Sequence, residues 1–258
     1  MSIHPTALVD AKAEIDTSVE IGPFSIIGPD VQIGAGTVVK SHVVINGHTT
    51  IGCDNEIYQF SSVGEANQDK KYRGEATRLV IGDNNIIREN ATIHRGTIQD
   101  NGITQVGSGN LFMASTHVGH DCVVGDNNIL ANYAALAGHV TIGDSILLGG
   151  YSGVHQFCRV GSFSMCGMGS MVTKDIPAYI MVSGNPARAH GMNFEGMRRR
   201  GMTSDVIKAL RTAYKLLYLK GLKLETALLE LEQGLAKEVI EVQAFIESIR
   251  QSKRGIVR

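Results

Sequence analysis

The sequence predicts a mainly β protein, a parallel β-helix of hexapeptide repeats followed by a C-terminal α-helical domain. Two observations support this prediction: an apolar residue returns at every sixth position through two long stretches, and the spacing becomes helical after Ser204. A helix would return apolar residues at three, four and seven positions, and a half-buried strand at two. A period of six instead indicates a solenoid in which each repeat forms one flat side of a coil.

The six-residue lattice is unbroken within both stretches. The first holds Ile3, Val9, Ile15, Ile21, Ile27, Ile33, Val39, Ile45, Ile51, Ile57 and Val63. The second holds Val106, Phe112, Val118, Val124, Leu130, Leu136, Ile142, Leu148, Val154, Val160, Cys166 and Val172. Because β-branched residues suit strands and glycine suits corners, we expect each hexad to be a short strand plus a corner. Three hexads then close a coil of about 18 residues, with successive coils about 4.8 Å apart.

Two polar interruptions of the lattice predict loops. The pattern breaks after Gly64 and resumes in phase at Ile81, and it breaks again between Ile93 and Val106. We therefore expect excursions near residues 64–79 and 94–104. Loops that interrupt a strict solenoid add no core, and such segments usually carry binding groups.

The end of the lattice predicts the domain boundary. Beyond Val172 the period fades through turn signals that end at Pro186, which divides the chain into a β-helix, 1–186, and a helical domain, 187–258. Ser204 is a candidate helix cap, followed by apolar residues at helical spacing up to Gly221. Two more amphipathic helices are expected at roughly 224–236 and 239–252.

Composition limits the classes of function. The chain has 258 residues and is 43% apolar, and its 24 basic and 25 acidic residues are balanced, which argues against nucleic acid as a partner. No apolar run reaches about eighteen residues, so we expect no stable membrane insertion and a cytoplasmic location. The four cysteines form no CxxC pair and are predicted to be reduced thiols.

One edge of the predicted coil gathers polar and titratable groups. His120 lies two positions past the inward lattice residue and is followed by Asp121, an arrangement suited to a general base. Stepping by 18 residues leads to Gly138, beside His139, and then to Gln156, beside His155. Gly138 could offer a backbone N–H to a developing oxyanion. Taken alone, His120 would more often be a solvated surface histidine, but the polar groups gathered on the same edge favour the general base.

Two further clusters leave alternatives open. His94, His117 and His120 could be zinc ligands from neighbouring coils or subunits, but that interpretation leaves the other polar groups and the long loop unexplained, so no metal is predicted. Arg198, Arg199 and Arg200 form a dense basic cluster. It is either a solvated turn or a clamp for a diphosphate or an acidic protein.

Several segments together resemble one family across essentially the whole chain. They are NQDKKYRGEATR, IHRGT, HVGHDC, LAGHV, GVHQFC and MNFEGMRRRG. In this order they are similar to the bacterial acyl-carrier-protein–UDP-N-acetylglucosamine O-acyltransferases, which start lipid A synthesis. The resemblance implies a left-handed coil, a homotrimer and active sites between subunits. The partners it implies are acyl carrier protein and UDP-N-acetylglucosamine, with no cofactor beyond the phosphopantetheine that the carrier protein holds.

The resemblance also implies residue roles. His120 is the general base that takes the proton of the glucosamine 3-hydroxyl, Asp121 supports it, and Gly138 supplies the oxyanion N–H. Substrate contacts are implied for Gln68, Asp69, Lys71, His117, His139, His155 and Gln156, and, at the nucleotide end, for Asn193, Glu195, Arg199 and Arg200.

One residue departs from the family pattern in a way that suggests specificity. Met168 stands where some members have glycine in the acyl groove. A methionine would shorten the groove, so we expect a donor nearer ten than fourteen carbons, unless Met168 points inward or against another subunit. The alternatives to the whole assignment are a related N-acyltransferase or acetyl-CoA-dependent enzyme, and a solenoid that acts only as a scaffold. Whether the acceptor is glucosamine or a 3-amino analogue is left open.

Overall fold

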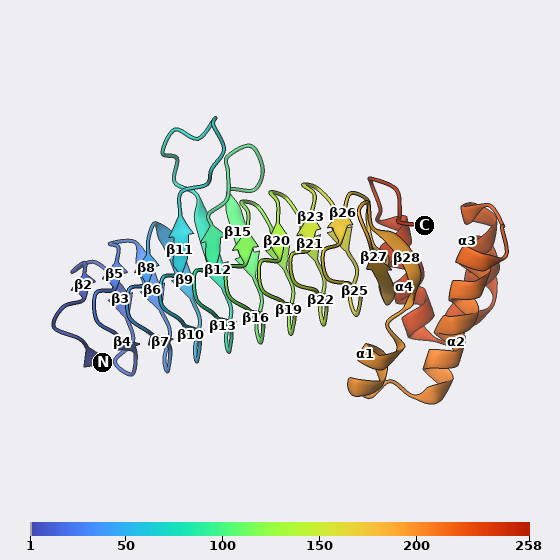
Figure 1. The fold of residues 1–258 in the computed structure, drawn as a ribbon, viewed down its shortest axis with the longest axis horizontal. Helices are drawn as coiled ribbons and strands as arrows, with labels where there is room; N and C mark the ends of the chain where they lie inside the picture. Colours follow the sequence, from blue (N-terminus) through green and yellow to red (C-terminus); the bar gives the residue numbers. More distant parts are fainter. Residues whose placement is uncertain (1) are drawn as a thin grey trace.

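The six-residue lattice folds as an elongated left-handed parallel β-helix with helices at its C-terminal end (Figure 1). The structure, a computed structural model, describes residues 2–258. Strands on successive coils pair in parallel, with Ser2 opposite Glu20 and Glu14 opposite Gln32. Both pairs are 18 residues apart, which confirms the predicted coil.

Three sheets form the sides of the coil, and each takes every third strand up to β26; β27 and β28 then extend the first sheet. Sheet A runs β1 (Ser2–Ile3), β4 (Glu20–Ile21), β7 (Val38–Val39), β10 (Glu56–Ile57), β13 (Ile86–Ile87), β16 (Leu111–Phe112), β19 (Ile129–Leu130), β22 (Leu147–Leu148), β25 (Met165–Cys166), β27 (Ile180–Ser183) and β28 (Arg188–Met192). Sheet B runs β2 (Leu8–Val9), β5 (Ile26–Ile27), β8 (Val44–Ile45), β11 (Ser62–Glu65), β14 (Thr92–His94), β17 (His117–Val118), β20 (Ala135–Leu136), β23 (Gly153–Val154) and β26 (Met171–Val172). Sheet C runs β3 (Glu14–Ile15), β6 (Val31–Ile33), β9 (His48–Ile51), β12 (Arg78–Ile81), β15 (Ile103–Val106), β18 (Val123–Val124), β21 (Thr141–Ile142) and β24 (Arg159–Val160).

The core is the inward row of lattice residues. From Ile21 to Val172 these side chains are buried, whereas Ile3 in the first coil is 37% exposed. A ladder of buried asparagines also runs along the inside of the coil; it consists of Asn55, Asn85, Asn110 and Asn128. The side-chain oxygen of each of the first three accepts the backbone N–H of the next at 2.8–2.9 Å. The ladder therefore satisfies buried polar groups from coil to coil.

Both predicted loops leave the coil along the same edge (Figure 1). The first, residues 66–77, joins β11 to β12, and the second, 95–102, joins β14 to β15. Asn67 in the first loop donates its side-chain N–H to the carbonyl of Gly96 at 3.0 Å. Arg95 donates to the Tyr72 hydroxyl at 2.9 Å. These contacts hold the two loops together.

The C-terminal region differs from the predictions at its start. Residues 184–187, where the sequence contains turn signals, form the turn of a hairpin, so antiparallel β28 extends sheet A beyond residue 186. Thr203, not Ser204, caps the second helix, because its hydroxyl accepts the N–H of Val206. The helices are α1 (Phe194–Arg199), which was not predicted, α2 (Ser204–Tyr214), the π-helix η1 (Lys215–Leu219), α3 (Leu224–Gln233), the 3₁₀ helix η2 (Leu235–Lys237) and α4 (Ile240–Arg250).

Two expectations from composition can be compared with the fold. Within residues 2–258 no helix has the length and apolar character needed to cross a membrane. All four cysteines lie in this range and are free thiols. Burial raises the pKa of Cys122 to about 12 and that of Cys158 to about 11, so both are inert as nucleophiles at neutral pH.

Candidate active site

The turns that join sheet B to sheet C carry the predicted polar edge. We call the turns after β17, β20 and β23 (residues 119–122, 137–140 and 155–158) the histidine corner. His139 N–H donates to the His120 carbonyl at 2.9 Å, and Phe157 N–H donates to the Gly138 carbonyl at 3.3 Å. His120, Gly138 and Gln156 therefore occupy equivalent places on successive coils.

Asp121 holds the His120 ring. Its Oδ2 lies 2.9 Å from His120 Nδ1, and its side chain is only 1% exposed. Thr97 donates its backbone N–H to Oδ1 at 2.9 Å and its hydroxyl to Oδ2 at 2.6 Å. Burial alone would raise the pKa of Asp121, but the hydrogen bonds from His120 and Thr97 hold it below its usual range. The carboxylate is thus ionised at neutral pH and fixes Nδ1 of His120 as the donor.

Gly138 lies directly against the His120 ring. A Cβ on Gly138 would lie 2.5 Å from Cε1 and 2.6 Å from Nε2 of that ring, so glycine is what leaves room for the imidazole. Among the described residues, neither His120 Nε2 nor the backbone N–H of Gly138 makes a hydrogen bond within the chain. A free base and a free donor therefore stand side by side.

Three more histidines surround His120. The His139 ring meets it edge to face, with centroids 4.9 Å apart, and stacks on Phe157 at 4.5 Å. His117 contacts the Thr92 hydroxyl through Nδ1 at 2.8 Å, and its ring meets that of His94 at 5.1 Å. Burial, followed by the nearby His117, lowers the pKa of His94 to about 4, and burial also lowers that of His117. Both rings are neutral at physiological pH.

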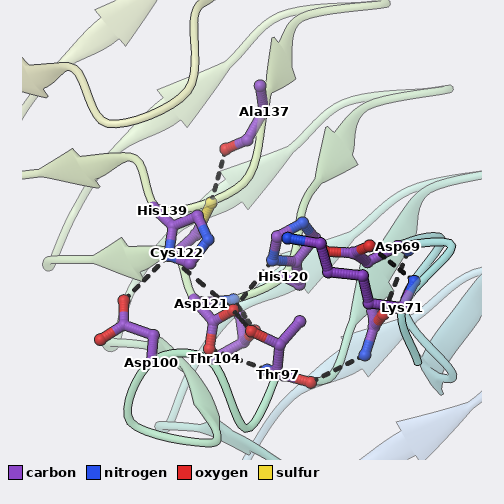
Figure 2. Close-up of polar contacts among 12 residues, drawn as sticks. Asp69, Lys71, Thr97, Asp100, Thr104, His120, Asp121, Cys122, Ala137 and His139 are labelled. Atoms are coloured by element: carbon purple, nitrogen blue, oxygen red, sulfur yellow. Dashed lines mark hydrogen bonds and ion pairs between the residues drawn. The ribbon is translucent and has the colours of Figure 1, made fainter. Parts of the chain in front are cut away.

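The second loop supplies contacts that the sequence did not reveal. Besides Thr97, it contributes Asp100, whose Oδ2 lies 2.8 Å from His139 Nδ1 (Figure 2). The hydroxyl of Thr104, in β15, accepts the backbone N–H of Asp121 at 2.8 Å. In the sequence these residues carried no signal beyond their place in or beside a predicted loop.

The first loop places its predicted residues at the same edge. The Asp69 carboxylate accepts the Lys71 backbone N–H at 2.9 Å, which closes a tight turn. In Figure 2 the Lys71 side chain points from this turn toward the His120 ring. Gln68 is exposed beside them, as are His155 and Gln156 on the histidine corner.

The remaining predicted residues lie on another side of the molecule. Asn193, Glu195, Arg199 and Arg200 line a cavity of ≈ 570 Å³ over sheet A, together with Ile129, Leu147 and Met165. Glu195 contacts Arg199 at 3.1 Å and Arg198 at 3.2 Å, and these bonds lower its pKa. In one chain this cluster is separated from His120 by the thickness of the coil, because sheet A faces away from the corner between sheets B and C.

An apolar groove runs along sheet B next to the histidine corner. It has a volume of ≈ 430 Å³, with Ala135 and Gly153 on its floor and His117 at one end. Met171 also lines it, and the Met171 Sδ would lie 3.1 Å from a Cβ at Gly153. Met168 is 76% exposed, so it does not point inward. It lies on the turn between sheets A and B, at the opposite edge of sheet B from His120.

One cluster of the described residues has metal-binding geometry. It consists of His120, Asp121 and His139, whose ligand atoms lie within 4.8 Å of one another. It differs from the set of His94, His117 and His120 considered from the sequence. Their facing atoms already have other partners, because Asp121 Oδ2 accepts hydrogen bonds from His120 Nδ1 and the Thr97 hydroxyl, and His139 Nδ1 pairs with Asp100. The absence of a metal from the reaction stays a prediction.

Comparison with known proteins places the chain in a family. The fold and the histidine corner define a hexapeptide-repeat acyltransferase. Residues 3–47 match the family of bacterial transferase hexapeptides, and residues 175–257 match the second domain of UDP-N-acetylglucosamine O-acyltransferases. The chain belongs to the acyl-[acyl-carrier-protein]–UDP-N-acetylglucosamine O-acyltransferase family, as the resemblance predicted.

Three relatives support this assignment. The enzyme of that name from Stutzerimonas stutzeri (strain A1501) is 56% identical over 81% of both chains. The one from Ectopseudomonas mendocina (strain ymp) is 58% identical over 79% of both. The crystal structure of UDP-N-acetylglucosamine O-acyltransferase from Moraxella catarrhalis RH4 covers 100% of both chains, with 55% identity and a TM-score of 0.97.

Proposed function

We propose that this acyltransferase moves a 3-hydroxyacyl chain from acyl carrier protein to the 3-hydroxyl of UDP-N-acetylglucosamine, the first step of lipid A biosynthesis, in the cytoplasm. The relatives' names supply the two substrates. The observation that carries the proposal is the arrangement around the His120 ring. A buried carboxylate holds its Nδ1, and its Nε2 is free and lies beside the Gly138 N–H, which has no partner among the described residues. Acyl transfer to an alcohol needs a base and an oxyanion donor, and these two groups fit both roles.

The reaction follows from these positions. His120 Nε2 takes the proton of the 3-hydroxyl while the oxygen attacks the thioester carbon. Negative charge then develops on the carbonyl oxygen, which accepts the Gly138 N–H, and Asp121 stabilises the imidazolium. The tetrahedral intermediate collapses, the carbon–sulfur bond breaks, and the sulfur takes the proton from His120. The products are the 3-O-acylated sugar nucleotide and the free phosphopantetheine thiol, and no other cofactor enters the balance.

The other polar groups then position substrates. Gln68, Asp69, Lys71, His117, His139, His155 and Gln156 surround the corner and are proposed to hold the sugar and the thioester. Asn193, Glu195, Arg199 and Arg200 are proposed to hold the nucleotide. Since arginine matches phosphate oxygens through paired N–H groups, the cavity over sheet A suits a diphosphate.

The separation of these two groups supports a homotrimer. A single substrate could reach both His120 and Arg199 only if neighbouring copies supply them. Subunit mixing tests this: His120→Ala and Arg199→Ala/Arg200→Ala chains, each weakly active alone, should regain turnover when refolded together, because some mixed sites contain both intact groups. Continued inactivity of the mixed trimers would place both groups in one subunit's site. An active monomer in sedimentation-coupled assays would contradict the trimer itself.

The groove on sheet B is proposed to hold the acyl chain. Its floor is small and apolar, and it begins beside His117. Each methylene of the acyl chain that is buried in the groove contributes about 0.8 kcal/mol to binding. A closed groove end would therefore reject a longer chain by steric overlap, which those extra methylenes cannot offset. Met168 remains our proposed limit on chain length, with a donor of about ten carbons. Competition between 3-hydroxydecanoyl and 3-hydroxymyristoyl carrier protein, repeated with Met168→Gly and with Met171→Ala, decides whether Met168, Met171 or neither sets it.

One assay separates the candidate functions. We expect purified protein to consume 3-hydroxyacyl carrier protein with UDP-N-acetylglucosamine, with the ester product identified by mass spectrometry. Preference for a 3-amino sugar nucleotide would indicate an N-acyltransferase, and equal use of coenzyme A thioesters would indicate the coenzyme A class. A scaffold would transfer nothing. The buried chain of hydrogen bonds from Thr97 through Asp121 to His120 argues against the scaffold, which has no need of it.

A further inference from the structure

The histidine corner contains two imidazole–carboxylate pairs rather than one. His120 pairs with Asp121 at 2.9 Å, and His139 pairs with Asp100 at 2.8 Å. The two rings are nearly perpendicular, at 89°, with centroids 4.9 Å apart. The second pair joins a coil of the β-helix to the loop of residues 95–102, and the mechanism above assigns no role to Asp100.

The two imidazoles face the same carboxylate oxygen. His139 Nδ1 lies 3.9 Å from Asp121 Oδ2, the atom that His120 Nδ1 contacts at 2.9 Å. The Thr97 hydroxyl also donates to this oxygen, at 2.6 Å. A small rotation of the His139 ring would therefore bring a third donor to an oxygen that already accepts two. Figure 2 shows Asp100 and Asp121 on different sides of the His139 ring nitrogen.

We propose that Asp100 is a positioning residue: by accepting the Nδ1–H of His139, it keeps that ring away from Asp121 and leaves Asp121 Oδ2 to His120. The inference rests on the proposed function, in which His120 is the base. Phe157 stacks on the face of His139 and restrains rotation about χ2, but a small change of χ1 could still move the ring along the stacked face toward Asp121. Asp100 supplies the missing restraint.

The same pair has little effect on global stability. The Asp100 side chain is 40% exposed, and ion pairs this open contribute little to folding because solvent screens them. The second loop is also held by Thr97 and by the Gly96 carbonyl, which accepts Asn67. Removing the Asp100 charge should therefore leave the loop in place and disturb only the competition between the two histidines.

The test is a double-mutant cycle between Asp100 and His139. Asp100→Asn should lower kcat about tenfold, with KM for both substrates within about twofold and an almost unchanged Tm. His139→Phe removes the competing nitrogen and retains the stack on Phe157. In that background Asp100→Asn should lower kcat no further. Gln99→Ala, an exposed neighbour in the same loop, is the matched control and should behave as the wild type.

Several outcomes would overturn the proposal. An equal loss of kcat from Asp100→Asn in both backgrounds would mean that Asp100 acts by itself or through the loop. A loss confined to KM would make it a substrate contact. A kcat unaffected by Asp100→Asn would remove it from the site.

A second readout needs no turnover. In ¹⁵N imidazole spectra, Asp100→Asn should shift the Nδ1 resonances of both His139 and His120, whereas an independent pair would shift His139 alone. If the wild type fails to acylate UDP-N-acetylglucosamine, the proposed function fails. The spectra would still decide whether Asp100 keeps the two histidines apart.

Discussion

The histidine corner and the cavity over sheet A differ in how their charged groups are held. At the corner, Asp121 is buried and accepts three hydrogen bonds from Thr97 and His120. At the cavity, Glu195 and Arg199 are exposed, and within residues 2–258 the ion pairs of Glu195 are with Arg198 and Arg199, one turn of α1 away. Exposed pairs of this kind contribute little and rearrange readily, whereas buried networks fix one geometry.

In the proposed function, this difference separates two tasks. A base must be in place before the reaction begins, so its carboxylate is buried and fully satisfied. A group that clamps a diphosphate must be able to exchange its internal partner for the ligand, so it is left in solvent. Substitutions in the two regions should therefore affect different kinetic constants.

The largest effect is expected at the corner. His120→Ala should lower kcat about 10²- to 10⁴-fold while the fold persists, because the side chain abstracts the proton but contributes little to the core. Steady-state kinetics and a melting curve check this. His190→Ala, an exposed histidine on β28, is the control. Near-normal turnover by purified His120→Ala protein would remove the base from the proposal.

Substitutions in the cavity over sheet A should mainly change KM. Arg199→Ala is expected to raise KM for the UDP-sugar about 10- to 100-fold with little change in kcat, and the difference from wild type should shrink at high salt. Arg198→Ala is a matched control, since Arg198 also pairs with Glu195 but does not line the cavity. Equal effects of the two substitutions would mean that only the charge of α1 matters.

A smaller effect should follow from loosening Asp121. Thr97→Val removes the hydroxyl donor, retains the backbone N–H, and should lower kcat about tenfold and stability by about 1.5–3 kcal/mol. Thr97→Ser should restore both. Loss of stability with unchanged kcat would show that the network supports the fold rather than the base.

The smallest expected effect is a pH dependence of stability near the corner. Burial lowers the pKa of His94 to about 4, whereas in the unfolded chain it titrates near 6.5. Between these values only the unfolded chain binds the proton, so stability should fall by on the order of 1–3 kcal/mol as pH drops from 6.5 to 4. Denaturant titrations across that window check this. The slope should decrease in His94→Gln, and an unchanged slope would assign it to other groups.

The sequence predicted the coil better than the loops. Inward residues such as Ile57 and Leu136 repeat with the geometry of the strands, so position alone revealed their burial. The same 18-residue step brought His120 and Gly138 together. Thr97 and Asp100 lie in a loop whose path depends on tertiary contacts, and no period could show that they face Asp121 and His139. The same step placed Met168 one coil beyond Gly150, but it counts coils and does not say which edge of a sheet a turn occupies, so the role of Met168 stays a prediction.

The asparagine ladder affects how the molecule opens. Each of its hydrogen bonds joins one coil to the next, so we expect coils to unfold one after another from an end of the β-helix. The helices protect the C-terminal end, while the first coil has lost part of its burial, as the exposure of Ile3 shows. Local unfolding should therefore start at the N-terminal coil and reach His120 only after the hydrogen bonds of the asparagine ladder have broken. Amide hydrogen exchange would record this as protection that rises from β1 toward β16, with the histidine corner in the part of the coil that opens last.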